Sequence, residues 1–161
     1  MRNDTVARRY AKALFELAVE TKTIEDVLQG MSNIDIALKN APQLNSVLLN
    51  PLVTPAEKTK LIKTITSNKL ILKFIDLLAR RKRMDLLSAS YDFLLGFYDE
   101  TNDLHRILVK TAHTLTETQK KMVEKTLTQK LGGTIIGKFE VAKDLIGGVW
   151  VKMGDKVLDT T

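Results

Sequence analysis

DLIGGVWVKMGDKVLD, residues Asp144–Asp159, places two glycine turns and two alternating apolar runs within sixteen residues. Alternation of apolar and polar side chains is typical of half-buried strands, and Gly147 with Gly148 is typical of a turn that enters one. Gly154 predicts a further turn, into residues 157–158. We expect these three glycines to serve backbone geometry, because glycine adopts conformations that other residues avoid. The stretch therefore predicts a small sheet without catalytic groups.

The segments before this stretch complete a small α/β domain. The expected strands are 106–112, 134–141 and 149–153, each rich in β-favouring residues. Between the first two, Thr116 and Gln119 have the spacing of a capping box at the start of a helix, which Gly132 can end. We therefore expect a β-α-β-β domain over residues 105–161.

Amphipathic helices fill the chain before this domain. Apolar side chains recur at every third or fourth position in six successive segments, which places them on one face of each helix. The segments are 4–21, 23–38, 44–48, 54–65, 70–83 and 85–98. The clearest start is Thr54, followed by Pro55 and Glu57, and Thr23 is expected to cap the second helix. Because each apolar stripe needs a partner, we expect a mainly α protein with a six-helix bundle over residues 1–104.

The composition excludes several classes of function. Cysteine is absent, which excludes disulfides and thiolate chemistry. No apolar run approaches the roughly 18 residues of a membrane span. The amino terminus carries charged residues where a signal peptide would be apolar. We therefore expect neither membrane insertion nor secretion.

The net charge of +6 is unevenly distributed. Residues 55–83 hold nine basic and two acidic residues, whereas residues 84–104 hold five acidic residues and no basic one. The run Arg80–Arg83 can bind phosphate, or it can close a helix whose negative end favours cations. Because the run lacks the interleaved aromatic residues of a nucleic-acid binder, a solvated helix end is the favoured interpretation. A basic RNA-binding or adaptor protein is the alternative.

Two other patterns resemble known sites and lack essential parts. Gly132–Lys138, GGTIIGK, has the spacing of a phosphate-binding loop, but Phe139 replaces the hydroxyl residue and the segment leads from helix into strand. His105 and His113 have no HExxH motif and no carboxylate pair near them in sequence. We therefore expect no catalytic residue, no cofactor and no metal site.

The first helix contains ARRYAKALFELA, residues Ala7–Ala18, in which small apolar residues alternate with large ones. Small side chains allow helices to approach closely. Two interpretations stay open, namely tight packing within the bundle or a groove for the helix of a partner protein.

Four stretches together resemble one family. They are ARRYAKALFELA (7–18), LLNPLVTPAEKTKLI (48–62), LLARRKRMDLL (77–87) and DLIGGVWVKMGDKVLD (144–159). Their combination and order are similar to the delta subunits of bacterial and chloroplast F-type ATP synthases, which are similar to the mitochondrial oligomycin sensitivity-conferring protein. The likeness covers nearly the whole chain.

The resemblance implies a non-catalytic stator protein. In that family the amino-terminal bundle binds the amino-terminal helices of alpha subunits on the catalytic head, and the carboxyl domain holds the peripheral-stalk b subunits. The link keeps the head from turning with the rotor, so that rotation is coupled to ATP synthesis and ion transport. The resemblance further implies one copy per complex, no cofactor, no direct nucleic-acid contact and no membrane insertion. Its implied location is the cytoplasmic face of the bacterial plasma membrane or the stromal side of the thylakoid.

The resemblance also implies where the alpha-subunit helix binds. We expect the first and fifth helices to flank its groove, with the residues Tyr10, Ala11, Ala13, Leu14, Leu17, Leu78, Arg80, Arg81 and Arg83. After Asp159 the family pattern continues with a hydroxyl residue and a short basic, leucine-bearing helix. The resemblance implies a carboxyl domain without that terminal helix.

Overall fold

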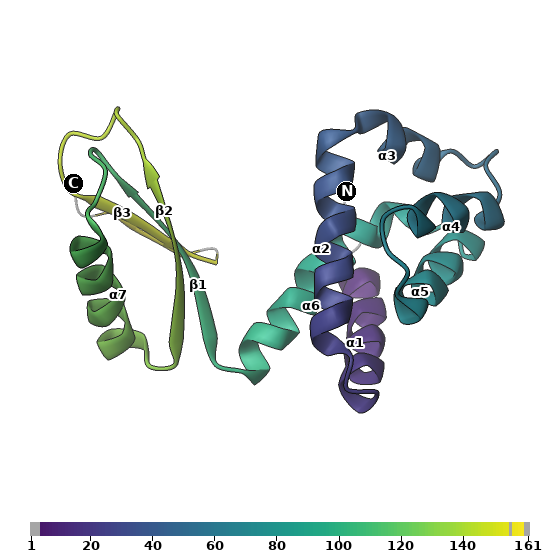
Figure 1. Cartoon of the computed structure of the whole chain (residues 1–161), viewed down its shortest axis with the longest axis horizontal. Coiled ribbons are helices and arrows are strands. Elements are labelled where there is room, and N and C mark those ends of the chain that lie inside the picture. Colours follow the sequence, from purple (N-terminus) through teal and green to yellow (C-terminus); the bar gives the residue numbers. More distant parts are fainter. Residues whose placement is uncertain (1–3, 155, 160–161) are drawn as a thin grey trace. The chain divides into compact units, whose positions relative to one another are not determined.

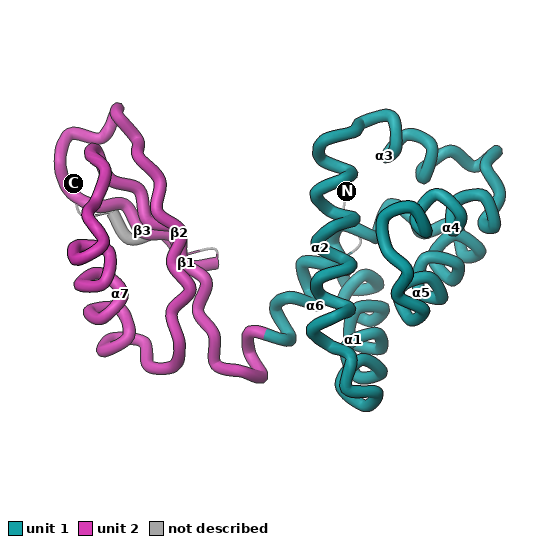
Figure 2. Tube along the Cα trace, in the orientation of Figure 1, with its two compact units in different colours: residues 1–98 teal, residues 99–161 magenta. Residues whose placement is uncertain are grey.

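The chain divides into two compact units, residues 1–98 and 99–161 (Figure 2). The structure is a computed structural model that describes residues 4–154 and 156–159. The prediction of a mainly helical protein with a small carboxyl-terminal sheet is confirmed. The division falls inside the last helix of the first unit, whereas the sequence predicted it after residue 104. The expected end of the pattern beyond Asp159 lies outside the described residues.

Unit 1 is helical throughout. Its elements are α1 (Asp4–Glu20), α2 (Ile24–Asn40), α3 (Pro42–Leu49), α4 (Pro55–Lys63), α5 (Lys69–Arg80), a 3₁₀ turn (Met84–Leu86) and α6 (Leu87–Thr101). All six helical segments expected from the apolar periodicity contain a helix, because a repeat of three and four residues fits only the helical turn.

The core of unit 1 forms where α1, α2, α5 and α6 meet. Small residues on α1 and branched residues on α5 are fully enclosed there, and Ala11, Ala18, Ile71, Ile75 and Leu78 are 0% exposed. Alanine on α1 lets the helix backbone approach its neighbours closely, which leaves room for the larger side chains of α5. The interpretation of ARRYAKALFELA as a tightly packed helix is therefore supported at these positions.

The start of α4 has the cap that the sequence predicts, and the start of α2 does not. The N–H of Glu57 donates to Thr54 Oγ1 (3.2 Å), and the N–H of Thr54 donates to Glu57 Oε2 (2.9 Å), so the predicted capping box of α4 is present. The prediction that the Thr23 side chain caps α2 is wrong. Its hydroxyl instead lies 2.8 Å from Thr21 Oγ1. Asn68, which the sequence analysis missed, caps α5 by accepting from the N–H of Ile71 (3.0 Å).

The described residues of unit 2, 99–154 and 156–159, form a four-stranded mixed sheet and one helix after the end of α6. Its elements are β1 (Leu104–Thr111), α7 (Glu117–Leu131), β2 (Thr134–Val141), β3 (Val149–Met153) and β4 (Lys156–Asp159). The strand order is β2-β1-β3-β4, with β1 parallel to β2 and antiparallel to β3. The predicted β-α-β-β order is incomplete, because the turn at Gly154 returns the chain antiparallel to β3 and adds β4.

Strand alternation divides the sheet into two faces. Ile107, Val109 and Thr111 of β1 are buried, and α7 lies along this face (Figure 1). The capping box predicted for α7 is present, since Thr116 Oγ1 accepts from the N–H of Gln119 (3.2 Å) and Gln119 Oε1 accepts in return (2.9 Å).

The glycine turns have the expected backbone. Gly147, Gly148 and Gly154 have φ values of 68°, 74° and 59°. A side chain at such angles clashes with its own backbone, so glycine is the favoured residue at these turns.

Candidate functional surfaces

The predicted groove residues separate into buried and accessible sets. Ala11, Leu14 and Leu78 are at most 3% exposed and belong to the core of unit 1. They pack α1 against its neighbours and have no free surface for a partner. Ala13 and Leu17 are exposed on α1, with Leu17 at 48%. The accessible part of the predicted groove therefore lies beside the small-residue stripe and not on it.

Aromatic contacts join α1 to α5. The Tyr10 ring meets Phe74 edge to face, with ring centroids 6.5 Å apart. The Arg83 guanidinium lies 5.8 Å from the centroid of the Tyr10 ring. Tyr10 and Arg83, both predicted for the groove, are thus brought together at the junction between the two helices. A cation over an aromatic ring is favourable, and this contact holds the end of the basic run against α1.

Accessible apolar residues flank that junction on both helices. On α5, Leu70 and Leu77 lie seven residues apart on one side of the helix. Leu77 is 39% exposed, whereas Leu70 is partly buried and packs against the core. Arg81 follows Leu77 by four residues and extends this side. We call Tyr10, Ala13, Leu17, Leu70, Leu77 and Arg81 the α1–α5 face. Leu70 and Leu77 were not among the residues predicted for the groove, although their spacing to Arg81 is that of a helical face.

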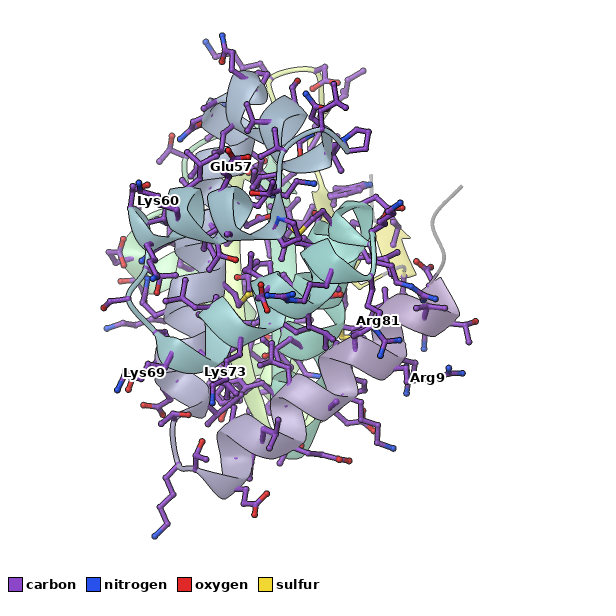
Figure 3. The ribbon with its side chains drawn as sticks, turned by 90° about the vertical axis from the view of Figure 1, so that its right-hand side faces the viewer. Arg9, Glu57, Lys60, Lys69, Lys73 and Arg81 are labelled. Atoms are coloured by element: carbon purple, nitrogen blue, oxygen red, sulfur yellow. The ribbon has the colours of Figure 1, made fainter. Side chains whose placement is uncertain are left out.

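Cations surround this part of unit 1. Figure 3 shows Arg81 after α5 and Arg9 on α1 towards one edge of the view, and Lys69 with Lys73 at the opposite end of α5. Arg9, Lys69 and Lys73 are exposed. An anionic or electron-rich partner group is favoured beside such a distribution.

The basic run itself is partly neutralised. Arg80 Nε donates to Asp76 Oδ2 at 2.7 Å, and this hydrogen bond raises the pKa of Arg80 above its ordinary value. Arg83 lies over Tyr10. Arg81 and Lys82 are exposed. Two of the four cations are engaged within the protein, which weakens the interpretation of the run as a phosphate-binding stripe.

Unit 2 presents a second accessible surface on the side of the sheet away from α7. The register places Leu108 opposite Lys152 and Lys138, and Lys110 opposite Trp150 and Glu140. We call Arg106, Leu108, Lys110, Ile136, Lys138, Glu140, Trp150 and Lys152 the open sheet face. Lys110 Nζ lies 4.8 Å from the centroid of the Trp150 ring, and an open depression of about 460 Å³ runs across the face. Apolar and basic side chains are therefore available together.

The two sequence patterns that resembled chemical sites, GGTIIGK and the histidines, belong to ordinary secondary structure or lie beside it. Gly132 ends α7 with φ 74°, and Lys138 lies within β2, so GGTIIGK leads from helix into strand as expected. His105 Nε2 lies 3.3 Å from Asp103 Oδ1. Among the described residues no group of three or more His, Asp or Glu side chains is placed to hold a metal ion. No described helix has the length and apolarity needed to cross a membrane.

Accessible apolar and charged side chains on a helical face of unit 1 and on a sheet face of unit 2 are typical of a binding protein. Comparison with known proteins gives the family. The family model described as ATP synthase delta (OSCP) subunit matches residues 6–161. The chain therefore belongs to the ATP synthase delta (OSCP) subunit family.

Individual relatives agree over nearly the whole chain. The ATP synthase subunit delta of Chlorobaculum tepidum is 35% identical over an alignment 162 positions long, which covers 99% of this chain and 90% of the relative. That of Syntrophobacter fumaroxidans is 33% identical and covers 99% of this chain and 89% of the relative. A chain in the Toxoplasma gondii mitochondrial ATP synthase hexamer has the same fold, with a TM-score of 0.76 over 99% of this chain and 90% of that chain at 19% identity.

Membership of this family gives the class of function. The chain is a non-catalytic subunit of ATP synthase and belongs to the stator, or peripheral stalk. The resemblance found in the sequence is thereby confirmed, and the RNA-binding alternative is not supported.

Proposed function

We propose that unit 1, as the six-helix bundle of this family, receives the amino-terminal helix of an alpha subunit on the α1–α5 face. Tyr10, Ala13 and Leu17 follow helical spacing, as do Leu70 and Leu77. Exposed apolar residues on two adjacent helices form the kind of surface that an amphipathic helix covers. The single observation that carries this proposal is the exposure of Leu17 (48%) and Leu77 (39%) on the two helices that the Tyr10–Phe74 contact joins.

We propose that unit 2 holds the b subunits of the peripheral stalk on the open sheet face. Leu108, Ile136 and Trp150 supply apolar and aromatic surface, and Ile136 is 39% exposed. Lys152 is an exposed cation beside them, and Lys138, which is also exposed, lies with its Nζ 3.5 Å from Glu140 Oε1. Aromatic anchors within a charged rim are favourable at protein interfaces, and the cations favour an acidic partner segment.

One copy of the chain then connects the head and the stalk. A complex at the cytoplasmic face of a bacterial plasma membrane, held through its partners, is the arrangement that we propose. Because the link must resist the torque of rotation, we expect an affinity for the head in the nanomolar range, about −12 kcal/mol, from several contacts.

The alpha-subunit contact is tested by calorimetry with a synthetic peptide of the alpha amino terminus. Leu17→Asp and Leu77→Asp each place a charge on the α1–α5 face, and each is expected to lower the affinity for the peptide by at least about tenfold. Lys60→Asp is the matched control, because Lys60 is exposed on α4 and lies outside the face. Unchanged affinity in both leucine variants would rule out this placement.

A further inference from the structure

Unit 1 contains a pocket that the α1–α5 face does not include. It encloses about 410 Å³ between the end of α3, the start of α4 and the link after α5. Leu48, Pro51, Val53, Ala79 and Met84 form apolar walls. None of the six residues of the α1–α5 face lines it. The pocket is therefore a feature in addition to the proposed alpha-subunit contact.

Lys58 lines this pocket in an unusual state. The residue is 7% exposed, and its side-chain ammonium has neither a hydrogen-bond partner nor an ion pair among the described residues. Its ammonium is not one of the fully enclosed polar atoms, so it reaches solvent. Burial of a charge is unfavourable unless an opposite charge or acceptor compensates it. Lys58 thus provides a cation without a protein partner at the wall of an apolar pocket.

The neighbouring charges do not neutralise Lys58. Glu57 is engaged in the capping box with Thr54, and Arg80 is paired with Asp76. Lys82 and Asp85 also line the pocket, and both are exposed. Lys58 and Lys82 together outweigh the single carboxylate of Asp85, so the free charge of the pocket is positive.

We propose that this pocket binds a carboxylate carried on an aliphatic arm, as an acidic side chain beside an apolar residue presents it in a partner polypeptide. The ammonium of Lys58 offers a charge-assisted hydrogen bond to the carboxylate, and the apolar walls cover the arm. Leu49 and Leu52 at the rim are 45% and 89% exposed and extend the apolar contact. Phosphate fits less well, because it prefers several converging N–H donors and a polar wall.

The test uses hexanoate as the probe and the full chain with ¹³C-labelled methionine methyl groups. Met84 lines the pocket and reports occupancy directly. We expect hexanoate to shift the Met84 methyl signal saturably at millimolar concentrations. Lys58→Met is expected to weaken this binding by at least about tenfold, since a charged hydrogen bond is lost. Lys60→Met removes an exposed lysine from the same helix and is expected to leave the affinity unchanged.

Each alternative result overturns the proposal. Hexanamide that binds as tightly as hexanoate would show purely apolar binding, and inorganic phosphate that shifts Met84 as strongly would show a general oxyanion site. Unchanged hexanoate affinity in the Lys58→Met variant would show that the ammonium of Lys58 does not bind the carboxylate. The Lys58→Met variant should melt no lower than the wild type, because the ammonium has no partner among the described residues to lose, and a large fall in Tm would mean that Lys58 already has one. The Lys58→Gln variant, titrated in parallel with hexanoate, removes the charge but keeps a polar side chain, and the Met84 methyl signal reports its affinity in the same way.

Discussion

Ala11 and Ala13 lie two positions apart on α1 and have opposite surroundings. Ala11 is 0% exposed within the core, whereas Ala13 is exposed on the α1–α5 face. We expect Ala11→Leu to lower the free energy of unfolding by about 1–3 kcal/mol, because a packed core has no room for the added atoms. Ala13→Leu should change it by no more than about 0.5 kcal/mol. Urea unfolding measures both, and equal effects would contradict the burial pattern.

Glu57 makes the start of α4 sensitive to pH. Hydrogen bonds from Thr54, chiefly from its backbone N–H, lower the pKa of Glu57 below its ordinary value of 4.5. A lowered folded-state pKa gives stability that is present above pH 4.5 and is lost as the pH falls through the folded-state pKa. We expect the stability advantage of the wild type over Glu57→Gln to be present at pH 7 and to disappear in acid, as thermal unfolding across pH would show.

The second capping box is a built-in control for this effect. Gln119 occupies in α7 the position that Glu57 occupies in α4, and its amide does not titrate. Gln119→Ala should therefore destabilise the protein equally at pH 7 and in acid. If the stability difference between the wild type and Glu57→Gln stays constant with pH, the charge of Glu57 does not contribute to the stability of α4.

At the scale of elements, two helical glycines have opposite roles. A Cβ added at Gly30 of α2 would meet the buried Ile71 side chain and would lie 3.0 Å from Thr66 Oγ1, whereas one added at Gly96 of α6 meets nothing within 4 Å. We expect Gly96→Ala to stabilise the protein by about 0.5–1 kcal/mol through helix propensity. Gly30→Ala should destabilise it by about 1 kcal/mol, because overpacking outweighs the same gain. Chemical denaturation measures the free energy of unfolding of both variants. Stabilisation by both substitutions would contradict the close approach of α2 to α5.

Elements were predictable from sequence where their signals are local. The capping boxes at Thr54 and Thr116 depend on residues three positions apart, and both are present. Thr23 has the right residue type, but the neighbouring hydroxyl of Thr21 competes for its side chain, and no sequence pattern reports that contact. The strand β4 was missed because four residues after a turn give too short an alternation to read.

The candidate surfaces were less predictable for a related reason. Periodicity places Leu14 and Leu17 on one face of α1, but only the position of α5, about sixty residues later, decides which of them is covered. The same contact buries Leu78 and leaves Leu77 exposed. The buried state of Lys58 likewise depends on the distant link after α5, so the pocket has no local signature.

Within the whole molecule, a protein that links head and stalk must combine two independent binding functions in one chain. The α1–α5 face belongs to unit 1 and the open sheet face to unit 2. We expect Leu17→Asp to abolish binding to the catalytic head and to leave binding to the stalk unchanged. We expect Leu108→Asp to abolish binding to the stalk and to leave binding to the head unchanged. Both effects are measured by pull-down of purified head and of a soluble b-subunit fragment. Loss of both partners in either variant would indicate one shared surface.

Sedimentation velocity of the full chain mixed with the purified catalytic head and the soluble b-subunit fragment tests the central claim most directly. We expect one ternary species that contains the head, the stalk fragment and a single copy of the chain. Competition between head and stalk fragment for the chain, seen as two binary species without a ternary one, would contradict the claim that this protein links them.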